Sequence, residues 1–272
     1  MNYFELFSLK NKSAIVTGGA GIIGSHICKG LADAGANVAI VDINIERARE
    51  IAKEIENKYK VKSIAIYCDI TSEQSVKEMV QIVVETFGEI NILHNNAAGK
   101  SSNLEAFFAP FEEYELSQWK EIMATNLDSM FLVAKYVGRV MKEQGKGGSI
   151  IQTSSIYGIN GPDNRIYEGS FYLNREINTP AIYSASKAGV IGLTKYLATY
   201  WAKEGIRVNS ITPGGVESGQ NEIFKQKYSN RIPLGRMAKA EEMVGAVIYL
   251  ASDASSYVTG QNIIVDGGLS AW

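Results

Sequence analysis

The stretch SAIVTGGAGIIG, residues Ser13–Gly24, decides how this chain folds. Its first five residues have strand character and run directly into a glycine-rich turn, and a helical pattern of apolar residues follows at Ile22–Ala34. In such a strand–turn–helix unit, the backbone N–H groups at the start of the helix can bind a pyrophosphate, and side chains on the turn would block its approach. The stretch therefore predicts a dinucleotide site. The alternative is that the glycines only make a tight turn.

Short β-rich runs and longer helical patterns alternate along the rest of the chain. This alternation is typical of a doubly wound α/β fold of the Rossmann type, in which helices cover both faces of a parallel sheet of about seven strands. No Ser/Pro-rich linker divides the 272 residues, so we expect residues 1–272 to form one domain. The predicted strands are Ser13–Thr17, Asn37–Val41, Ser63–Tyr67, Asn91–His94, Ser149–Thr153, Arg207–Ile211 and Asn262–Val265. The predicted helices are Ile22–Ala34, Ile45–Asn57, Glu73–Phe87, Trp119–Gln144, Tyr183–Glu204 and Ala240–Ser252.

Two long stretches interrupt this alternation. Residues 158–182 are rich in Asn, Gly, Tyr and Arg, and residues 213–236 begin with Pro213-Gly214-Gly215. Long irregular segments of compact domains often form active-site loops and lids. We therefore predict an active-site loop at 158–182 and a substrate lid at 213–236.

Composition and charge exclude several classes of function. The chain is 46% apolar and 21% charged, and its formal net charge of -2 gives no positive field for nucleic acid or an anionic membrane. Its apolar runs are far shorter than the roughly 18 residues that a spanning helix needs, and the first residues do not resemble a signal peptide. We therefore expect a cytoplasmic protein. Two cysteines without a CxxC spacing and two histidines predict neither a disulfide framework nor a metal site.

Two acidic residues follow predicted strands. Asp42 ends the second strand, 24 residues after Gly18, close to the offset of roughly 20 expected of a carboxylate that binds the adenosine ribose. Because such a carboxylate repels a 2′-phosphate, Asp42 predicts NAD rather than NADP, unless it only caps the next helix. Asp69, after the third strand, is expected to hydrogen-bond the adenine edge, with a role at a helix N-terminus as the alternative.

Taken together, the motifs of the chain resemble those of the short-chain dehydrogenase/reductase family. The resemblance runs from Ser13 to the last predicted strand. Ile22 and Ala98 depart from it, because the family usually has glycine at both positions. The motifs are Thr17-Gly18 with the glycines that follow, Asn95-Asn96-Ala97, Thr125-Asn126-Leu127, Thr153-Ser154-Ser155, Tyr183-Ser184-Ala185-Ser186-Lys187 and Pro213-Gly214.

The residues with catalytic chemistry include Tyr183 and Lys187, which lie four apart on one face of a predicted helix. A free tyrosine has a pKa near 10, so proton transfer near pH 7 requires a depression of about 3 units, which a desolvated lysine and a positive nicotinamide could supply. The resemblance implies that Tyr183 exchanges the proton and that Ser155, with Ser154 as the fallback, holds the substrate oxygen. It further implies that Asn126 holds a water that relays protons through Lys187. The alternatives are an ordinary helix pair and a packing role for Asn126.

The resemblance also implies a nicotinamide cofactor and the residues that bind it. Ser218 stands where many relatives have threonine, so a hydroxyl is retained. The implied cofactor residues are Gly18, Gly21, Ile23, Gly24, Asp42, Asp69, Ile70, Asn96, Ala97, Tyr183, Lys187, Pro213, Gly214, Val216 and Ser218.

The 158–182 loop looks like an insertion relative to compact family members, and it bears on the substrate. Its polar side chains favour a sugar, a sugar acid or a sugar derivative over a steroid or an acyl chain. The loop and lid are similar to those of sugar-modifying oxidoreductases of the flagellin-glycosylation type. The alternative is a solvated loop or an oligomer contact. The polar side chains are those of Asp163, Asn164, Arg165, Tyr167, Glu168 and Arg175.

We therefore expect an NAD-dependent oxidoreductase that interconverts a secondary alcohol and a ketone on a small polar substrate. The spacing of Gly18, Gly21 and Gly24 matches the nucleotide-sugar epimerase branch, so an NAD-retaining epimerase or dehydratase stays open. The same motifs also leave open a 3-oxoacyl-thioester reductase and a non-catalytic dinucleotide sensor. The resemblance implies a homotetramer in which the helices at Trp119–Gln144 and Tyr183–Glu204 pair between subunits.

Overall fold

The sheet is the centre of the computed structural model, which describes residues 2–272 except 100, 102, 173 and 174. Seven strands form this sheet, and every neighbouring pair is parallel, which confirms the predicted fold class. In spatial order they are β3 (Ser63–Tyr67), β2 (Asn37–Asp42), β1 (Ser13–Thr17), β4 (Ile92–Asn95), β5 (Gly148–Thr153), β8 (Ile206–Pro213) and β9 (Asn262–Val265). A separate antiparallel pair, β6 (Phe171–Tyr172) and β7 (Arg175–Glu176), lies in the 158–182 loop.

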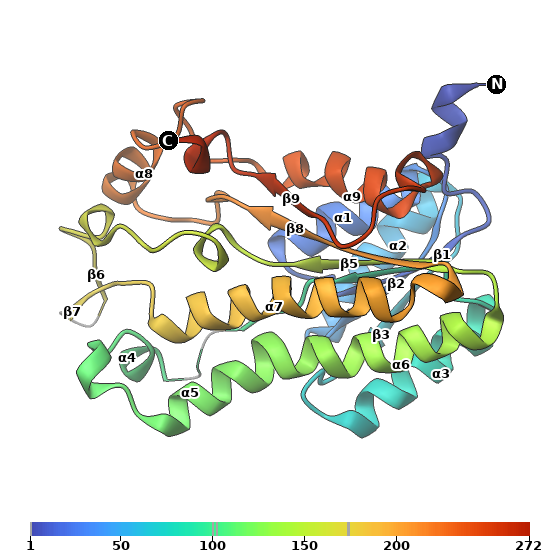
Figure 1. Ribbon diagram of the computed structural model, residues 1–272, viewed down its shortest axis with the longest axis horizontal. Coiled ribbons are helices and arrows are strands. Elements are labelled where there is room, and N and C mark those ends of the chain that lie inside the picture. The colour runs from blue at the N-terminus through green and yellow to red at the C-terminus, as the bar shows by residue number, and fades with distance from the viewer. Residues whose placement is uncertain (1, 100, 102, 173–174) are drawn as a thin grey trace.

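Helices cover both faces of the sheet (Figure 1). Ser72 caps α3 by accepting from the Ser75 N–H, and Gly88 ends that helix in the left-handed region at a φ of 83°. None of the helices in the described residues combines the length and the apolar run that crossing a bilayer takes. The helices are α1 (Ile22–Asp33), α2 (Ile45–Tyr59), α3 (Glu73–Phe87), α4 (Leu104–Phe107), α5 (Leu116–Met123), α6 (Ser129–Gln144), α7 (Ala181–Tyr200), α8 (Glu222–Ser229) and α9 (Val244–Ala251).

The core lies in two layers, one on each face of the sheet. All of β1 is buried, and its side chains alternate between the faces. Ile15 joins the layer beneath α3, α6 and α7, whereas Ala14 and Val16 join the layer beneath α1, α2 and α9. Burial on both faces explains why the strands of this chain are continuous apolar runs rather than alternating ones.

The predicted helix over 119–144 is two helices joined by a π-helical turn at Ala124–Asp128. One such wide turn inside a longer helix breaks the regular hydrogen-bond ladder and is frequent at functional sites. The turn contains Asn126, which is fully buried. The sequence pattern did not reveal this interruption, because apolar spacing on either side of it still fits a helix.

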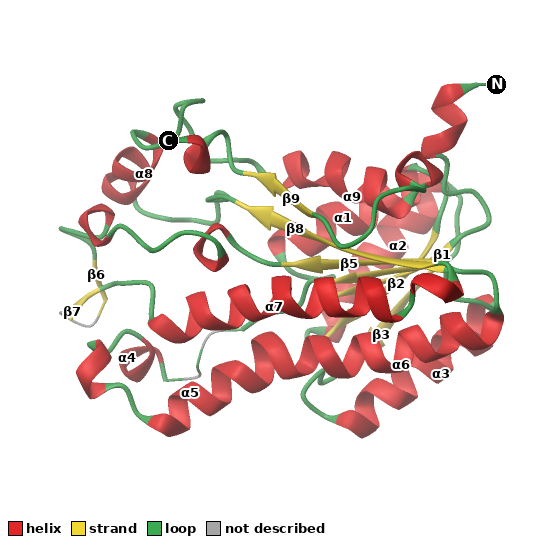
Figure 2. Cartoon of the chain, in the orientation of Figure 1, coloured by secondary structure: helices red, strands yellow, loops and turns green. Residues whose placement is uncertain are grey.

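Both long irregular stretches lie at the carboxyl edge of the sheet. The arrowheads of β5, β8 and β9 point to the end of the molecule that holds α8 and the β6–β7 pair (Figure 2). Apolar side chains of the 158–182 loop and of α8 share a third buried cluster, which includes Ile166, Tyr167 and Tyr228. The two stretches therefore pack against each other at the edge where ligands of such folds bind.

Candidate active site

The glycine turn between β1 and α1 is shaped to admit a pyrophosphate. A Cβ on Gly24 would lie 2.1 Å from the Gly18 carbonyl oxygen, and Gly18 itself has a φ of +64°. Gly21 begins α1 without a side-chain cap, so the N–H groups of the first helical turn have no side-chain acceptor. Gly24 therefore lets the helix pack closely on the turn, and the uncapped N–H groups at this helix N-terminus fit an anionic group of a cofactor.

Ile22 and Ala98, which replace two family glycines, do not strain the backbone. Among the described residues, only Asn11 and Lys60 combine a side chain with a positive φ. Ile22 is 52% exposed and, like Ala98, lines the cavity beside the glycine turn. Neither position therefore requires glycine.

Thr17 links the ends of the neighbouring strands β1 and β4 by hydrogen bonds. Its hydroxyl donates to Asn95 Oδ1 at 3.2 Å and accepts from the backbone N–H groups of Asn96 and Ala97 at 2.9 and 3.1 Å. Asn96 Nδ2 returns a hydrogen bond to the Thr17 carbonyl at 3.2 Å. The residues predicted at this point thus form one rigid edge next to the Gly18 turn.

Asp42 lies against the glycine turn and does not cap α2. Its Oδ2 accepts from the Ala20 N–H at 2.9 Å and its Oδ1 accepts from the Asn44 N–H at 2.9 Å. The cap of α2 is Asn44, which accepts from the Arg47 N–H. A carboxylate beside the turn is where a ribose-binding acid is expected.

Asp69 and Ile70 follow β3 at the same edge. Asp69 Oδ1 accepts from the Thr71 N–H and hydroxyl at 2.9 and 2.7 Å, which shapes the turn into α3. Ile70 is only 9% exposed and its side chain belongs to the core. Any contact of Ile70 with a cofactor would therefore come from its backbone.

A cavity of about 270 Å³ connects the glycine turn with the predicted catalytic residues. It brings together residues from β1–α1, β4, β5, α7 and the segment after β8, which lie far apart in the sequence. Its lining consists of Ile22, Ile23, Asn96, Ala98, Thr153, Ser154, Ser155, Tyr183, Lys187, Pro213, Gly214, Val216 and Ser218.

Lys187 is buried beside Tyr183. Its Nζ donates to the Thr153 carbonyl at 3.0 Å and lies 6.0 Å from the centre of the Tyr183 ring. Burial lowers the pKa of Lys187 to about 8. Burial also raises the pKa of Tyr183, although the hydrogen bond from Ser155 opposes that change. The predicted depression of the Tyr183 pKa does not come from Lys187 here, so this phenol stays protonated at neutral pH in the chain alone.

The structure separates the two candidate serines. Ser154 is 3% exposed and donates to the Lys187 carbonyl at 2.7 Å, so its hydroxyl serves the packing of α7 on β5. Ser155 accepts from the Tyr157 N–H at 3.3 Å, lines the cavity beside Tyr183, and lowers the pKa of that phenol. Its position favours Ser155 as the group that holds a substrate oxygen.

Asn126 sits in the π-helical turn behind these residues. Its Oδ1 accepts from the Gly99 N–H at 2.9 Å, while its Nδ2 is buried without a hydrogen-bond partner among the described residues. A buried donor of this kind normally has an ordered water as its acceptor. The role of Asn126 in proton relay stays a prediction.

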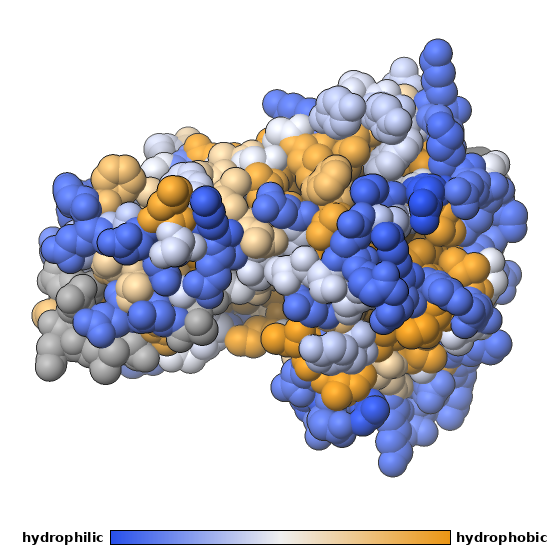
Figure 3. Space-filling model, turned by 90° about the horizontal axis from the view of Figure 1, so that it is seen from below, coloured by the Kyte–Doolittle hydropathy of each residue, from blue (hydrophilic) through white to orange (hydrophobic). Residues whose placement is uncertain are grey.

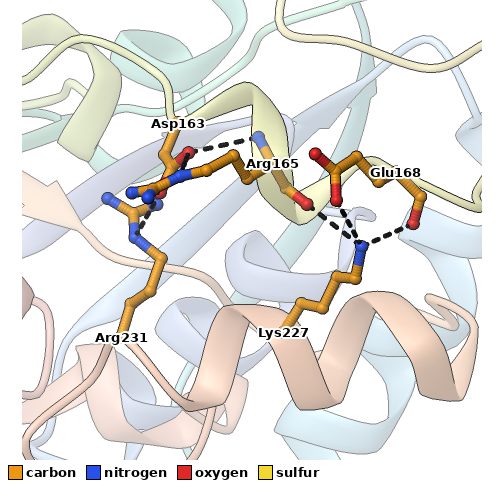
Figure 4. Close-up of polar contacts among 5 residues, drawn as sticks. All are labelled: Asp163, Arg165, Glu168, Lys227 and Arg231. Atoms are coloured by element: carbon orange, nitrogen blue, oxygen red, sulfur yellow. Dashed lines mark hydrogen bonds and ion pairs between the residues drawn. The ribbon is translucent and has the colours of Figure 1, made fainter.

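A second cavity, of about 350 Å³, opens beside Ser155 and Tyr183. Of the described polar residues expected here from the 158–182 loop, only Tyr167 lines it. Asp163, Arg165 and Glu168 instead form ion pairs with one another or with residues at α8 (Figure 4). The side chain of Arg175 is outside the described part of the chain. The lining is Phe107, Phe108, Ser155, Ile156, Tyr157, Tyr167, Ile177, Asn178, Thr179, Pro180, Tyr183, Gly214, Gly215, Gln220, Asn221, Phe224, Tyr228 and Met237.

Sequence reasoning missed the roles of three residues that line these cavities. Phe224 and Tyr228 stack at 5.6 Å on one face of α8, a stretch read as a polar lid, although their spacing of four was a signal of a helical apolar face. Thr153 places Lys187 through its carbonyl, and its hydroxyl hydrogen-bonds His94 Nε2 at 2.9 Å. Thr153 belongs to the Thr153-Ser154-Ser155 motif, but the motif does not predict these two contacts, because both partners are distant in the sequence.

The chain is similar to known proteins in both sequence and structure. A family model described as enoyl-(acyl carrier protein) reductase matches residues 18–270. The chain is 38% identical over 271 residues to the NADP-dependent mannitol dehydrogenase of Alternaria alternata, covering 97% of this chain and 94% of that protein. A solved short-chain type dehydrogenase/reductase from Mycobacterium marinum is similar at a TM-score of 0.86 and 33% identity, over 100% of both chains. A gluconate 5-dehydrogenase from Burkholderia cenocepacia, solved with NADP and tartrate, is similar at a TM-score of 0.84 and 32% identity, over 98% of both chains.

Proposed function

The chain belongs to the short-chain dehydrogenase/reductase family and is an oxidoreductase of alcohol groups with a nicotinamide cofactor, and we propose that it uses NAD to interconvert a secondary alcohol and a ketone on a sugar or polyol. The observation that carries the proposal is one continuous arrangement of residues. Ile22 and Ile23, which follow the glycine turn that Asp42 contacts, line the cofactor cavity together with Ser155, Tyr183 and Lys187. Ser155 and Tyr183 also line the second cavity.

The residues of the chain would manage the proton in this reaction, while the bound nicotinamide supplies or accepts the hydride. In ketone reduction, Ser155 holds the substrate oxygen by a hydrogen bond and Tyr183 donates its phenolic proton to that oxygen. The raised pKa of Tyr183 keeps this proton in place at neutral pH. Lys187 then provides the positive charge beside the phenolate that remains. In alcohol oxidation, Tyr183 would first lose its proton, which the positive charges of Lys187 and of an oxidised nicotinamide would favour, and the phenolate would then accept the proton of the alcohol.

The substrate class rests on the relatives and on the second cavity. Two of the similar proteins carry the names mannitol dehydrogenase and gluconate 5-dehydrogenase. Tyr167, Asn178 and Thr179, whose side chains carry hydroxyl or amide groups, line the same cavity as Ser155. Hydroxyl-rich substrates use such groups for orientation.

A 3-oxoacyl-thioester reductase is the second candidate. The chain is 35% identical over 265 residues to a 3-oxoacyl-[acyl-carrier-protein] reductase of Aquifex aeolicus, which favours this candidate. The apolar side chains of Phe107, Phe108 and Met237 in the second cavity favour it as well. The two candidates differ in the substrate that the same catalytic residues would act on.

A substrate screen tests the proposal. The purified protein is titrated with NADH and NADPH by fluorescence, and turnover is then followed at 340 nm with polyols, ketoses, sugar acids and a 3-oxoacyl thioester. We expect tighter binding of NADH and turnover of a polyol or ketose. Turnover of the thioester alone would overturn the proposed substrate class, and turnover of nothing with tight NADH binding would support a dinucleotide sensor.

Asp42→Asn is expected to shift cofactor preference toward NADP. The amide removes the charge that repels a 2′-phosphate but keeps an oxygen that can accept from the Ala20 N–H. We expect the ratio of kcat/KM with NADP to kcat/KM with NAD to rise about 10-fold, which corresponds to about 1.4 kcal/mol. Asp33→Asn, at the far end of α1, is the matched control. An unchanged ratio in the Asp42 variant would show that this carboxylate does not discriminate between the two cofactors.

We also propose that the chain assembles into a homotetramer. Apolar patches interrupt the hydrophilic surface on the face shown in Figure 3. Leu127, Phe131, Leu132 and Leu193 line an open groove between α6 and α7, the helices implied in pairing, and Phe131 is 50% exposed. Large exposed apolar side chains in one patch mark protein interfaces. Light scattering on the purified protein is expected to give four chains per particle, and a monomer would overturn this part of the proposal.

A further inference from the structure

We propose that Tyr167 determines substrate specificity by hydrogen-bonding a hydroxyl group on the carbon next to the reacting carbon. This inference rests on the proposed function and narrows it to substrates whose ketone or alcohol has an adjacent hydroxyl. Tyr167 belongs to the 158–182 loop and to none of the motifs that carry the catalytic chemistry.

Tyr167 faces the space in which the reaction would occur. It lines the second cavity together with Ser155 and Tyr183, and it is only 8% exposed. Tyr167 and the catalytic residues Ser155 and Tyr183 thus share the walls of one cavity of about 350 Å³. A substituent next to the reacting carbon would therefore lie within reach of Tyr167.

The ring of Tyr167 is held in place by contacts on two sides. It packs against Phe224 of α8 with ring centres 5.5 Å apart. Its hydroxyl lies 2.5 Å from Thr179 Oγ1 and 3.5 Å from the hydroxyl of Tyr157. A fixed ring loses little conformational entropy on binding a ligand, which makes it suited to recognition.

The three hydroxyl groups of Tyr157, Tyr167 and Thr179 retain hydrogen-bonding capacity. Three hydroxyls contain three O–H donors, and the two bonds that link them use two of these donors. One donor and several lone pairs remain for a ligand. Burial also raises the pKa of Tyr157, which keeps its phenol neutral. The group can thus both donate to and accept from a hydroxyl, which is itself a donor and an acceptor.

The charged side chains near the loop form ion pairs with one another and do not line the second cavity. Asp163 pairs with Arg165 at 2.8 Å and with Arg231 at 3.3 Å, and Lys227 reaches the carboxylate of Glu168 at 3.2 Å and its carbonyl at 2.8 Å (Figure 4). None of the described residues that line the cavity is Asp, Glu, Lys or Arg. Burying a carboxylate or phosphate without a charged partner is costly. The substrate group that Tyr167 hydrogen-bonds is therefore a neutral hydroxyl.

Acetoin and 2-butanone test this inference, because they differ only by a hydroxyl next to the carbonyl. Reduction of both by NADH is measured for the wild type, for Tyr167→Phe and for the control Tyr196→Phe, whose ring is 61% exposed on α7. We expect the wild type to favour acetoin at least 10-fold in kcat/KM. Tyr167→Phe keeps the contact with Phe224 and should lose that preference about 10-fold, with 2-butanone turnover and NADH affinity unchanged.

Several results would overturn the inference. These are equal turnover of both ketones by the wild type, an unchanged preference in Tyr167→Phe, and a parallel loss for both ketones, which would indicate a structural role. If the wild type reduces neither acetoin nor any ketose of the substrate screen, the proposed substrate class fails together with this inference. A loss of preference in Tyr196→Phe as well would also contradict a specific role of Tyr167.

Discussion

Tyr183→Phe is expected to lower kcat by about 1,000-fold while the affinity for NADH stays within about threefold of the wild type. Phenylalanine preserves the ring, so its packing and its contact with the Lys187 ammonium, 6.0 Å from the ring centre, remain. The substitution removes the hydroxyl that carries the transferable proton in the cavity that Ser155 also lines. A positioned general acid or base contributes about 100- to 10,000-fold. Steady-state kinetics at 340 nm and a fluorescence titration with NADH measure the two effects separately.

Tyr157→Phe is the matched control for this prediction. Tyr157 lines the same second cavity, and its pKa is also raised by burial, but the lining of the cofactor cavity does not include it. Its loss should reduce kcat by less than 10-fold. If Tyr183→Phe keeps more than about a tenth of the wild-type kcat, Tyr183 is not the proton donor.

Lys187→Met is expected to raise the free energy of unfolding by about 2 kcal/mol at pH 7. Burial lowers the pKa of Lys187 from 10.5 to about 8, so holding the charge in the folded chain costs about 3 kcal/mol at pH 7. Loss of the hydrogen bond to the Thr153 carbonyl reduces this gain in the free energy of unfolding by about 1 kcal/mol. A stabilising substitution at a residue that catalysis needs is the sign of a strained active site.

The stability difference between the wild type and Lys187→Met should change with pH in a definite direction. Because the folded-state pKa lies below the unfolded one, the unfolded chain binds more protons between about pH 8 and 10.5. Wild-type stability should therefore rise relative to the variant across this window, and the advantage of methionine should disappear above it. Urea unfolding without cofactor at pH 7, 8.5 and 10 measures the change. Lys195→Met, an exposed position on the same helix, is the control. A difference that is constant with pH, or a variant less stable at pH 7, contradicts the prediction.

The active site could be predicted from sequence wherever its chemistry depends on local spacing. Tyr183 and Lys187 share a helix face because they are four residues apart, and the glycine turn follows a strand directly. The substrate side depends on contacts between segments instead. Tyr167 meets Phe224 across 57 positions of sequence, and neither residue alone signals the other.

The sequence by itself determined the parallel sheet, the covering helices and the order of the motifs, because periodicity reports which residues must be buried on which face. Only the tertiary structure showed which partners the charged loop residues have and which serine acts on Tyr183. It also showed that Asn126 lies in a π-helical turn. The polarity of a residue does not show which partner its side chain binds. Asp163 and Glu168 are equally hydrophilic whether they form ion pairs near α8 or surround a substrate. Which of these arrangements forms is set by the packing of the 158–182 loop on α8, and that packing exists only in the folded chain.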